Sequence, residues 1–119
     1  MDKDRAKALL ADERQRVQRL LDETVAAGRS DRVAADDAGH EDIDDSAERL
    51  VAERTDDAVA DGLRQRLAAL DLAEKRLVEG TYGRSVRSGA PISDARLEAD
   101  PAAELTIEEA EEAERTPGV

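Results

Sequence analysis

The sequence lacks cysteine altogether, and Tyr82 is its only aromatic residue. Without cysteine, disulfide bonds and thiolate metal sites are excluded. Aromatic side chains supply much of the buried area in deep globular cores, so their near-absence argues against such a core. The chain has 119 residues, which fits one domain of modest size, and it is rich in Ala, Leu, Glu, Arg and Asp. This composition predicts an all-α protein in which long helices pack in shallow layers.

Positive charge is also in short supply. Asp and Glu together number 30 against 18 Lys and Arg, which gives a net charge of −12. This balance argues against direct binding to a nucleic-acid backbone, because that binding needs Lys and Arg to neutralise phosphates. It favours a partner with a basic surface or a bound cation. Acidity alone equally fits a protein that is simply well hydrated.

Long apolar runs are missing too, and none approaches the length that crosses a membrane. The first residues, MDKDRAKALLADERQRV, are charged throughout and do not resemble a signal peptide. We therefore predict a cytoplasmic protein with no membrane partner. The single histidine, the missing nucleotide-binding glycine fingerprint and carboxylates without apolar surroundings lead us to predict no enzymatic activity.

Apolar spacing predicts two long helices. Residues 3–27 form the first, with Leu10, Val17 and Leu20 on one face, and Gly28 is its predicted stop. The second runs from Asp45 or Ser46 to Glu79. Its apolar residues recur at steps of three and four, as in a coiled-coil seam, and they are Ala52, Val59, Leu63, Leu67, Leu70 and Leu77. A polar connection over 28–44 joins the two helices, which predicts a long antiparallel coiled-coil hairpin over 1–79. We call this hairpin the arm, and its acidic tip is predicted near 28–47.

The remaining residues, 80–119, are expected to form a small module. Pro91 and Pro101 interrupt regular structure, so residues 85–107 are predicted to be a compact irregular segment with room for a short hairpin. Thr106, followed three positions later by Glu109, fits the N-terminal cap of a short final helix.

Several short stretches resemble the DksA/TraR family of bacterial transcription regulators. The matching residues are VEGTYG at 78–83, GAPI at 89–92, ARLEADP at 95–101 and Asp42-x-x-Asp45-x-Ala47 upstream. The family's pattern at these stretches is a helix end, a turn into a zinc finger and an acidic arm tip. The resemblance implies that five residues form the turn after the second helix and the joint between module and arm. They are Tyr82, Gly83, Gly89, Arg96 and Leu97.

The chain differs from the family at the positions of the zinc-binding residues. Where the family usually carries four zinc-binding cysteines, this sequence has Ser85, Ser88, Thr106 and Glu109. Neutral hydroxyls are poor zinc ligands, so we predict no zinc, no other cofactor and a degenerate zinc-finger-like module. The hydroxyls are expected to hydrogen-bond turn amides instead. The residues expected to pack the module in place of zinc are Tyr82, Val86, Ile92, Leu97, Leu105 and Ile107.

The resemblance implies a regulator that binds RNA polymerase through its secondary channel, without direct DNA binding. Its acidic tip acts near the active site, so Asp42 and Asp45 are the predicted acting residues, with Ala47 as their small neighbour. Two alternatives stay open. Asp45 is also a helix N-cap candidate, and the chain also fits an acidic helical-hairpin adaptor that kept the fold but lost polymerase binding.

A guanosine tetraphosphate site receives little support. The positions that correspond to the family's basic residues hold none here, being Gln65, Ala69, Asp100 and Ala110. Arg96 is retained, but it also fits an anchor between module and arm that pairs with an acid. The basic residues of the second helix, Arg76 among them, fit a solvated face with pairs such as Asp71–Lys75.

Overall fold

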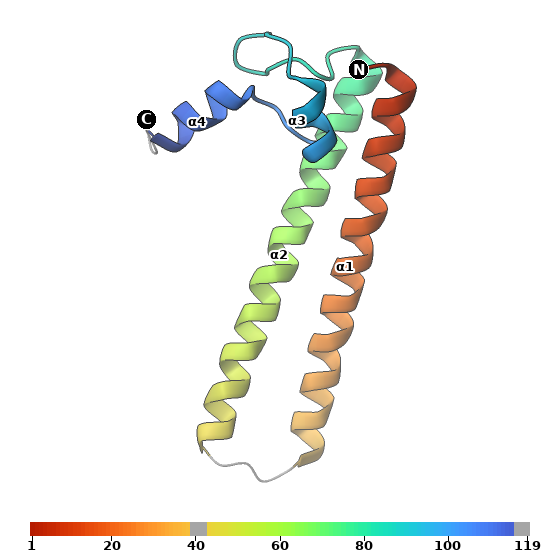
Figure 1. The fold of residues 1–119 in the computed structure, drawn as a ribbon. Helices are drawn as coiled ribbons and strands as arrows, with labels where there is room; N and C mark the ends of the chain where they lie inside the picture. Colours follow the sequence, from red (N-terminus) through yellow and green to blue (C-terminus); the bar gives the residue numbers. More distant parts are fainter. Residues whose placement is uncertain (39–42, 116–119) are drawn as a thin grey trace. The chain divides into compact units, whose positions relative to one another are not determined.

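Four α-helices make up the regular structure of the residues that are described (Figure 1). The computed structural model describes residues 1–38 and 43–115, and for 30–38, 43–46 and 49 it describes the backbone only. The helices are α1 (Lys3–Ala38), α2 (Ile43–Glu79), α3 (Asp94–Ala99) and α4 (Ile107–Arg115). The described residues contain no β-strand, only an isolated antiparallel bridge between Arg84 and Pro91. The all-α prediction is confirmed.

The chain divides into two compact units. Unit 1 consists of Met1–Arg14 and Ala68–Val119, and unit 2 consists of Gln15–Leu67. In each unit a part of α1 lies antiparallel beside a part of α2, as a helical hairpin requires (Figure 1). The domain boundary predicted after residue 79 stays a prediction.

The first helix is longer than predicted. α1 continues through Gly28 to Ala38, so the predicted stop at Gly28 is wrong. A glycine inside a helix costs only about 1 kcal/mol relative to alanine, which favourable neighbours and packing can offset. Gly28 is buried within unit 2. The predicted connection over 28–44 shrinks accordingly to residues 39–42, which lie outside the described part of the chain.

The second helix begins earlier than predicted. α2 starts at Ile43, and Asp45 is therefore its third residue. An N-cap residue lies outside the helical turns and has non-helical backbone angles, so the cap role predicted for Asp45 is wrong. An acidic residue in the first turn still interacts favourably with the positive end of the helix dipole.

The seam of α2 is confirmed in unit 1 and shifted in unit 2. Leu70 is fully buried in unit 1. In unit 2, however, Ala60 is buried, whereas Ala52 is exposed and Val59 is 48% exposed. The predicted positions Ala52 and Val59 are therefore wrong. A step of three from Leu63 leads to Ala60, and the helix buries this small residue in place of a larger one.

A small core holds unit 1 together beyond the two long helices. Ile92, Leu97 and Ala103 are buried, and Tyr82 packs against them. Ile92, Leu97 and Tyr82 were predicted for this role. Val86 and Ile107 were predicted as well, but they are 58% and 47% exposed, so these two assignments are wrong. Two buried alanines that the pattern did not mark, Ala102 and Ala103, fill the space.

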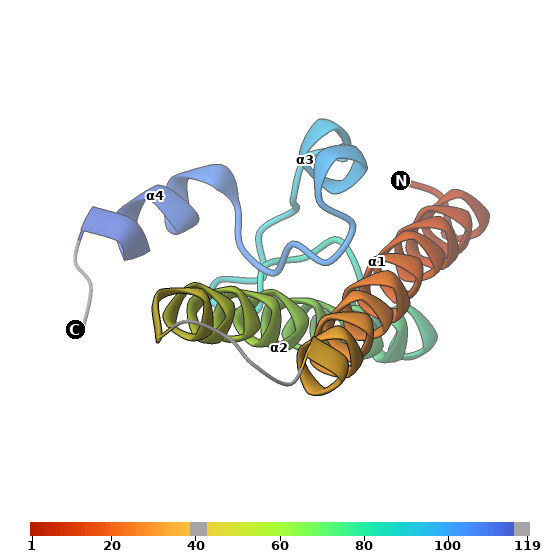
Figure 2. The ribbon, with the colours of Figure 1, turned by 90° about the horizontal axis from the view of Figure 1, so that it is seen from below.

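The segment predicted to be irregular contains the short helix α3. Ser93 caps it by accepting a hydrogen bond from the Arg96 amide at 3.2 Å. Figure 2 shows α3 near the N-terminus, where the Met1 amino group lies 3.0 Å from the Asp94 carboxylate. The Arg5 guanidinium also pairs with Glu98 of α3. These polar contacts fasten α3 to the first turns of α1.

No helix within residues 1–38 or 43–115 is long and apolar enough to span a membrane.

Candidate functional site

Two groups of predicted residues were candidates, and the structure describes them unequally. Asp42 lies outside the described residues. Asp45 is placed as a helical residue of α2, but its side chain is not described, and Ala47 is exposed on the same helix. The tip role of these three residues stays a prediction.

The four positions at which the resemblance predicted cysteines come together in unit 1. Ser85 and Ser88 lie in the turn after α2, and Thr106 and Glu109 stand at the start of α4. The hydroxyls of Ser85 and Ser88 both lie close enough to the Glu109 carboxylate to lower its pKa. The two serines and the start of α4 therefore meet in space although about twenty residues separate them in the sequence. We call Ser85, Ser88, Thr106 and Glu109 the serine–glutamate cluster.

Ser85 organises the turn. Its side-chain oxygen accepts hydrogen bonds from the amides of Arg87 at 3.1 Å and Ser88 at 3.2 Å. Ser88 acts likewise, accepting from the Ala90 amide at 3.2 Å. Ser85 is also only 5% exposed, so it is a buried polar residue whose hydrogen bonds are made. The prediction that the hydroxyls bond to turn amides is confirmed.

Glu109 caps its own helix. The Thr106 amide donates to the Glu109 carboxylate at 3.0 Å, and the Glu109 amide donates to the Thr106 hydroxyl oxygen at 3.2 Å. This reciprocal pair is a complete capping box, as predicted from the sequence. One carboxylate thus serves the start of α4 and the turn at residues 85–88 together.

The electrostatics follow from these donors. The Ser85 hydroxyl, and after it the Thr106 amide, donate to the carboxylate and lower the pKa of Glu109 to about 2. Hydrogen bonds to the charged form are a sufficient physical cause for this direction. The carboxylate is therefore ionised throughout the physiological pH range.

The cluster does not fit a structural zinc ion. Such a site needs four good donors, usually thiolates and imidazoles, and here three of the four positions are neutral hydroxyls. The oxygens of Ser85 and Ser88 already accept amide hydrogen bonds, and both hydroxyls lower the pKa of the neighbouring Glu109 carboxylate. Among the described residues, no group of three His, Cys, Asp or Glu side chains is placed to hold a metal.

Glycines shape the turn on either side of the cluster. Gly83 has φ of +83° and Gly89 has φ of +76°, which are left-handed conformations that other residues adopt with strain. The two glycines flank the bridge between Arg84 and Pro91. Both were predicted as turn residues, and their backbone angles give the physical reason for glycine there.

The chain between α3 and α4 is held by its carbonyl groups. The Tyr82 hydroxyl donates to the Pro101 carbonyl at 2.8 Å. The Val86 amide donates to the Glu104 carbonyl at 2.9 Å, and the Arg96 Nε donates to the Leu105 carbonyl at 2.8 Å. This segment leads directly to Thr106, so these bonds set where the cluster forms. Arg96 therefore hydrogen-bonds a backbone carbonyl within the module, whereas one alternative from the sequence was an anchor to the arm through an acid.

Arg76 is the residue that sequence reasoning missed. Its side chain is only 13% exposed and contacts Glu104 at 3.1 Å and the Ala103 carbonyl at 3.2 Å. Its own carbonyl accepts hydrogen bonds from the amides of Thr81 and Tyr82. The prediction that Arg76 belongs to a solvated face is therefore wrong. One signal in the sequence could have indicated burial of Arg76, namely its position next to the seam residue Leu77.

The partner expected for Asp71 also changes. Asp71 and Glu74 of α2 both pair with Arg14 of α1, and Glu74 lies 2.8 Å from the Arg14 Nε. These two carboxylates raise the pKa of Arg14, and the hydrogen bond that Arg14 donates to Glu74 is the largest cause. Asp71 thus links the two long helices of unit 1 instead of forming only a pair within α2.

Comparison with known proteins gives a consistent result. Two curated proteins from two strains of Caulobacter vibrioides, each named RNA polymerase-binding transcription factor DksA, are 34% identical to this chain over 76 residues. The match covers 64% of this chain and 54% of each relative, so the chain spans about half the length of the curated relatives it matches. No protein-family model matches the sequence.

The fold is shared more widely than the sequence. The structure of transcription factor DksA2 from Pseudomonas aeruginosa superimposes with a TM-score of 0.79 at 27% identity. The superposition covers 95% of this chain and 83% of the DksA2 chain. The similarity thus includes the long helices and the residues that follow them.

Proposed function

We propose that the chain is a member of the DksA/TraR family and a transcription regulator that binds RNA polymerase. The observation that carries the proposal is the pairing of a DksA2-like fold over nearly the whole chain with relatives whose name states polymerase binding. Regulators of this kind are not enzymes, and the serine–glutamate cluster is fully engaged in hydrogen bonds that hold the fold.

We further propose that the arm enters the secondary channel of the polymerase with its tip first. Asp42 and Asp45 then supply carboxylates near the catalytic Mg²⁺, and Ala47 permits close approach. Carboxylates are suitable ligands for Mg²⁺ and favourable in a basic channel. The net charge of −12 supports this choice of partner and opposes direct contact with DNA.

Guanosine tetraphosphate is not part of the proposal. Of the four positions that correspond to basic residues in the family, Asp100 is acidic and Gln65, Ala69 and Ala110 are neutral. The amide of Ala102 also donates to the Asp100 side chain at 3.2 Å, which gives this residue a role in a turn.

The test combines a binding assay with transcription in vitro. The whole chain is incubated with purified bacterial RNA polymerase, complex formation is measured, and promoter output is then compared with and without the protein. The double variant D42N/D45N is expected to bind polymerase about as well as the wild type but to lose the effect on output. The matched control is D4N/D12N, which removes two exposed carboxylates of α1.

The outcomes separate the two levels of the proposal. A wild-type protein that neither binds polymerase nor alters output overturns the proposed function and favours an acidic adaptor. If the wild type acts and D42N/D45N acts equally well, the tip role is wrong while polymerase binding stands. An equal loss in D4N/D12N points to net charge as the cause.

A further inference from the structure

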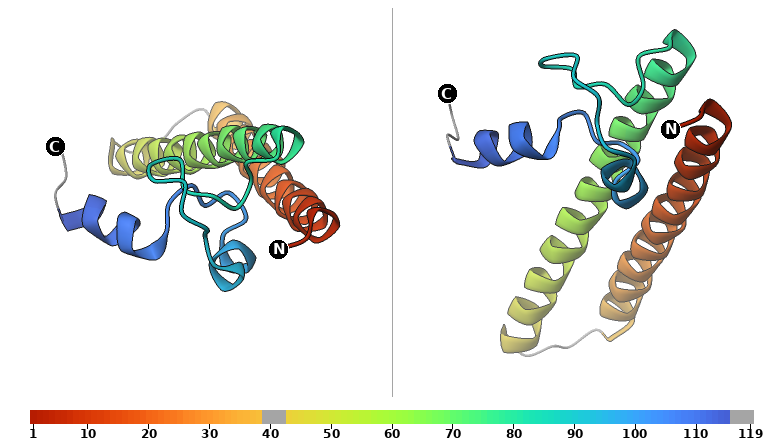
Figure 3. Two further views of the ribbon diagram at one scale, coloured as in Figure 1. Left: turned by 90° about the horizontal axis from the view of Figure 1, so that it is seen from above. Right: turned by 45° about the horizontal axis from the view of Figure 1, so that its top comes forward.

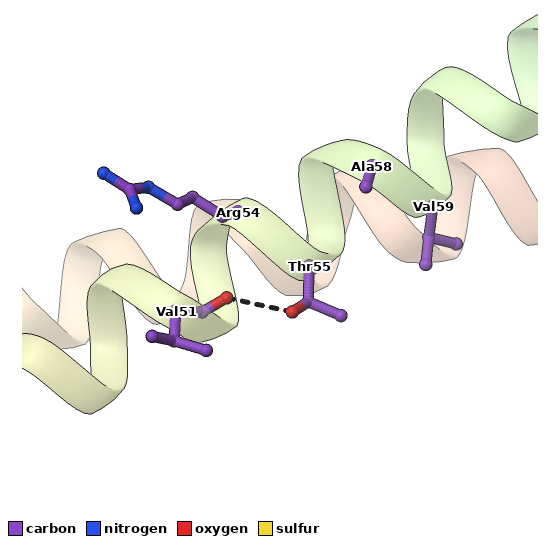
Figure 4. Close-up of a pocket in the computed structure, with 5 residues that line it drawn as sticks. All are labelled: Val51, Arg54, Thr55, Ala58 and Val59. Atoms are coloured by element: carbon purple, nitrogen blue, oxygen red, sulfur yellow. Dashed lines mark hydrogen bonds between the residues drawn. The ribbon is translucent and has the colours of Figure 1, made fainter.

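An exposed apolar stripe runs along α2 in unit 2. Val51 and Val59 are 62% and 48% exposed, and Thr55 lies one turn from each. Figure 4 shows these side chains on one side of the helix. The Thr55 hydroxyl donates to the Val51 carbonyl at 2.9 Å, so its polar group is satisfied within the helix. With Arg54 and Ala58, these residues line a shallow groove of about 570 Å³.

Small residues continue the stripe and let another helix approach closely. Ala58 belongs to the groove, and Gly62 follows one turn later. A Cβ atom added at Gly62 meets nothing within 4 Å, so the surface there is open. Large residues beside small ones on one helix face form the ridges and grooves into which a second helix packs.

Charged residues stand at both ends of the stripe with opposite sign. Glu48 and Arg66 are eighteen residues apart, which is five turns of 3.6 residues, so both point to the side that carries Thr55. The acid precedes the apolar residues and the base follows them. On one flank the order is reversed, because Arg54 precedes Asp61 by about two turns. Arg54 and Asp61 are both exposed, and Asp61 also pairs with Arg64 of its own helix at 3.1 Å.

This arrangement is complementary to itself when read in the opposite direction. If two copies of the stripe pack antiparallel about a point near residue 57, Glu48 of one copy stands opposite Arg66 of the other. In the same register Thr55 faces Val59, and Arg54 falls beside Asp61 of the other copy. A two-fold axis forms each pair twice. We therefore propose that the stripe binds a second copy of the chain, antiparallel and through a two-fold axis.

The charges favour this occupant over a foreign helix of one sign. A basic partner would face Arg54 and Arg66, and an acidic partner would face Glu48 and Asp61. An inverted copy meets each charge with its opposite. The association is weak and reversible, because exposed ion pairs contribute little and both copies carry a net charge of −12.

Self-association has a consequence that rests on the proposed function. An arm that is paired with a second arm is too broad to enter a narrow channel. At high protein concentration the dimer would therefore keep the regulator from binding polymerase. The association itself does not depend on polymerase. It is therefore tested on the purified protein alone, where its failure leaves the proposed function unaffected.

Sedimentation equilibrium over a wide range of protein concentration is the first measurement. The average mass of the wild type is expected to rise toward twice the monomer mass. In V51S/V59S the association is expected to weaken at least about tenfold, because two apolar contacts are lost in each copy. V78S is the matched control, since Val78 is 81% exposed on the same helix but belongs to unit 1. Far-UV circular dichroism verifies that the helices are intact.

A charge exchange then tests the register. R54D and D61R alone each place like charges opposite one another and weaken the association, whereas the double variant R54D/D61R restores it. A wild type that stays monomeric at all concentrations overturns the proposal, and so does a dimer that V51S/V59S leaves unchanged. If the double variant stays as weak as the single variants, the two-fold antiparallel arrangement is wrong.

Discussion

The Glu109 carboxylate lies beside the Ser85 hydroxyl, which lowers its pKa, and so relates α4 to the turn that follows α2. Every residue of α4 keeps part of its surface exposed, which leaves little apolar burial to hold the helix in place. Figure 3 shows α4 as a short helix set apart from α3. The other contacts of α4 with this turn are polar too: the Ser88 hydroxyl reaches the same carboxylate, and Arg87 lies 3.5 Å from Glu112. The start of α4 is therefore positioned by hydrogen bonds and charge.

The first prediction concerns acid. Because the pKa of Glu109 is lowered to about 2 in the folded protein, its contribution to stability is present above the ordinary carboxyl pKa. That contribution is lost as the pH falls from about 4.5 toward 2. E109Q is expected to have a lower melting temperature at neutral pH and a flatter dependence of stability on pH in this window. Thermal melts at stepped pH values measure both.

The control for this prediction is E108Q, which changes the neighbouring carboxylate in the first turn of α4. It should leave the acid profile close to that of the wild type. Equal profiles for wild type and E109Q would show that the carboxylate does not hold α4.

The second prediction concerns metal. A strong chelator is expected to leave the melting temperature unchanged, because the cluster offers hydroxyls where zinc needs thiolates. The comparison protein is the fourfold variant S85C/S88C/T106C/E109C, whose melting should respond to zinc and to chelator. A clear loss of wild-type stability on chelation would contradict the absence of a structural metal.

The third prediction uses Tyr82 as a probe. Burial raises the pKa of Tyr82 above its ordinary value of 10. As Tyr82 is the only aromatic residue, the near-ultraviolet absorbance of tyrosinate reports this group alone. Stability is expected to be complete below pH 10 and to fall as the pH rises through the pKa of the folded protein. Titration of folded and denatured protein should give a higher midpoint for the folded form.

The fourth prediction compares two side chains of the same module. L97A is expected to cost about 2–5 kcal/mol of unfolding free energy, because Leu97 is 1% exposed and its removal leaves a cavity. V86A is expected to change stability by no more than about 0.5 kcal/mol, since Val86 is 58% exposed. Urea denaturation measures both, and similar losses would contradict the assigned core.

The fifth prediction concerns the joint at Arg76. R76Q is expected to cost about 1–3 kcal/mol, since it breaks a pair with Glu104 and a bond to the Ala103 carbonyl in a largely buried place. K75Q removes the adjacent charge from an exposed position and serves as the control. If both variants melt alike, Arg76 acts only as surface charge.

Features that depend on residues close in the sequence were predictable. The Thr106–Glu109 capping box joins residues three apart, so the pattern and the geometry agree. The glycines at 83 and 89 follow the same logic, because a tight turn imposes their backbone angles locally. The resemblance to known regulators added the expectation that Ser85 and Ser88 belong with this pair.

Features that depend on distant contacts were not predictable in the same way. The local preference at Gly28 amounts to only about 1 kcal/mol, which is too small to decide by itself where α1 ends. Whether Arg76 faces water or the joint depends on Glu104, twenty-eight residues away. The sequence by itself determined the all-α class, the final helix cap and the loss of thiolate ligands, because these follow from composition and short spacing. Only the tertiary structure decided which face of α2 is buried and that a single carboxylate joins the turn to α4, because those outcomes depend on the packing of segments far apart in the chain.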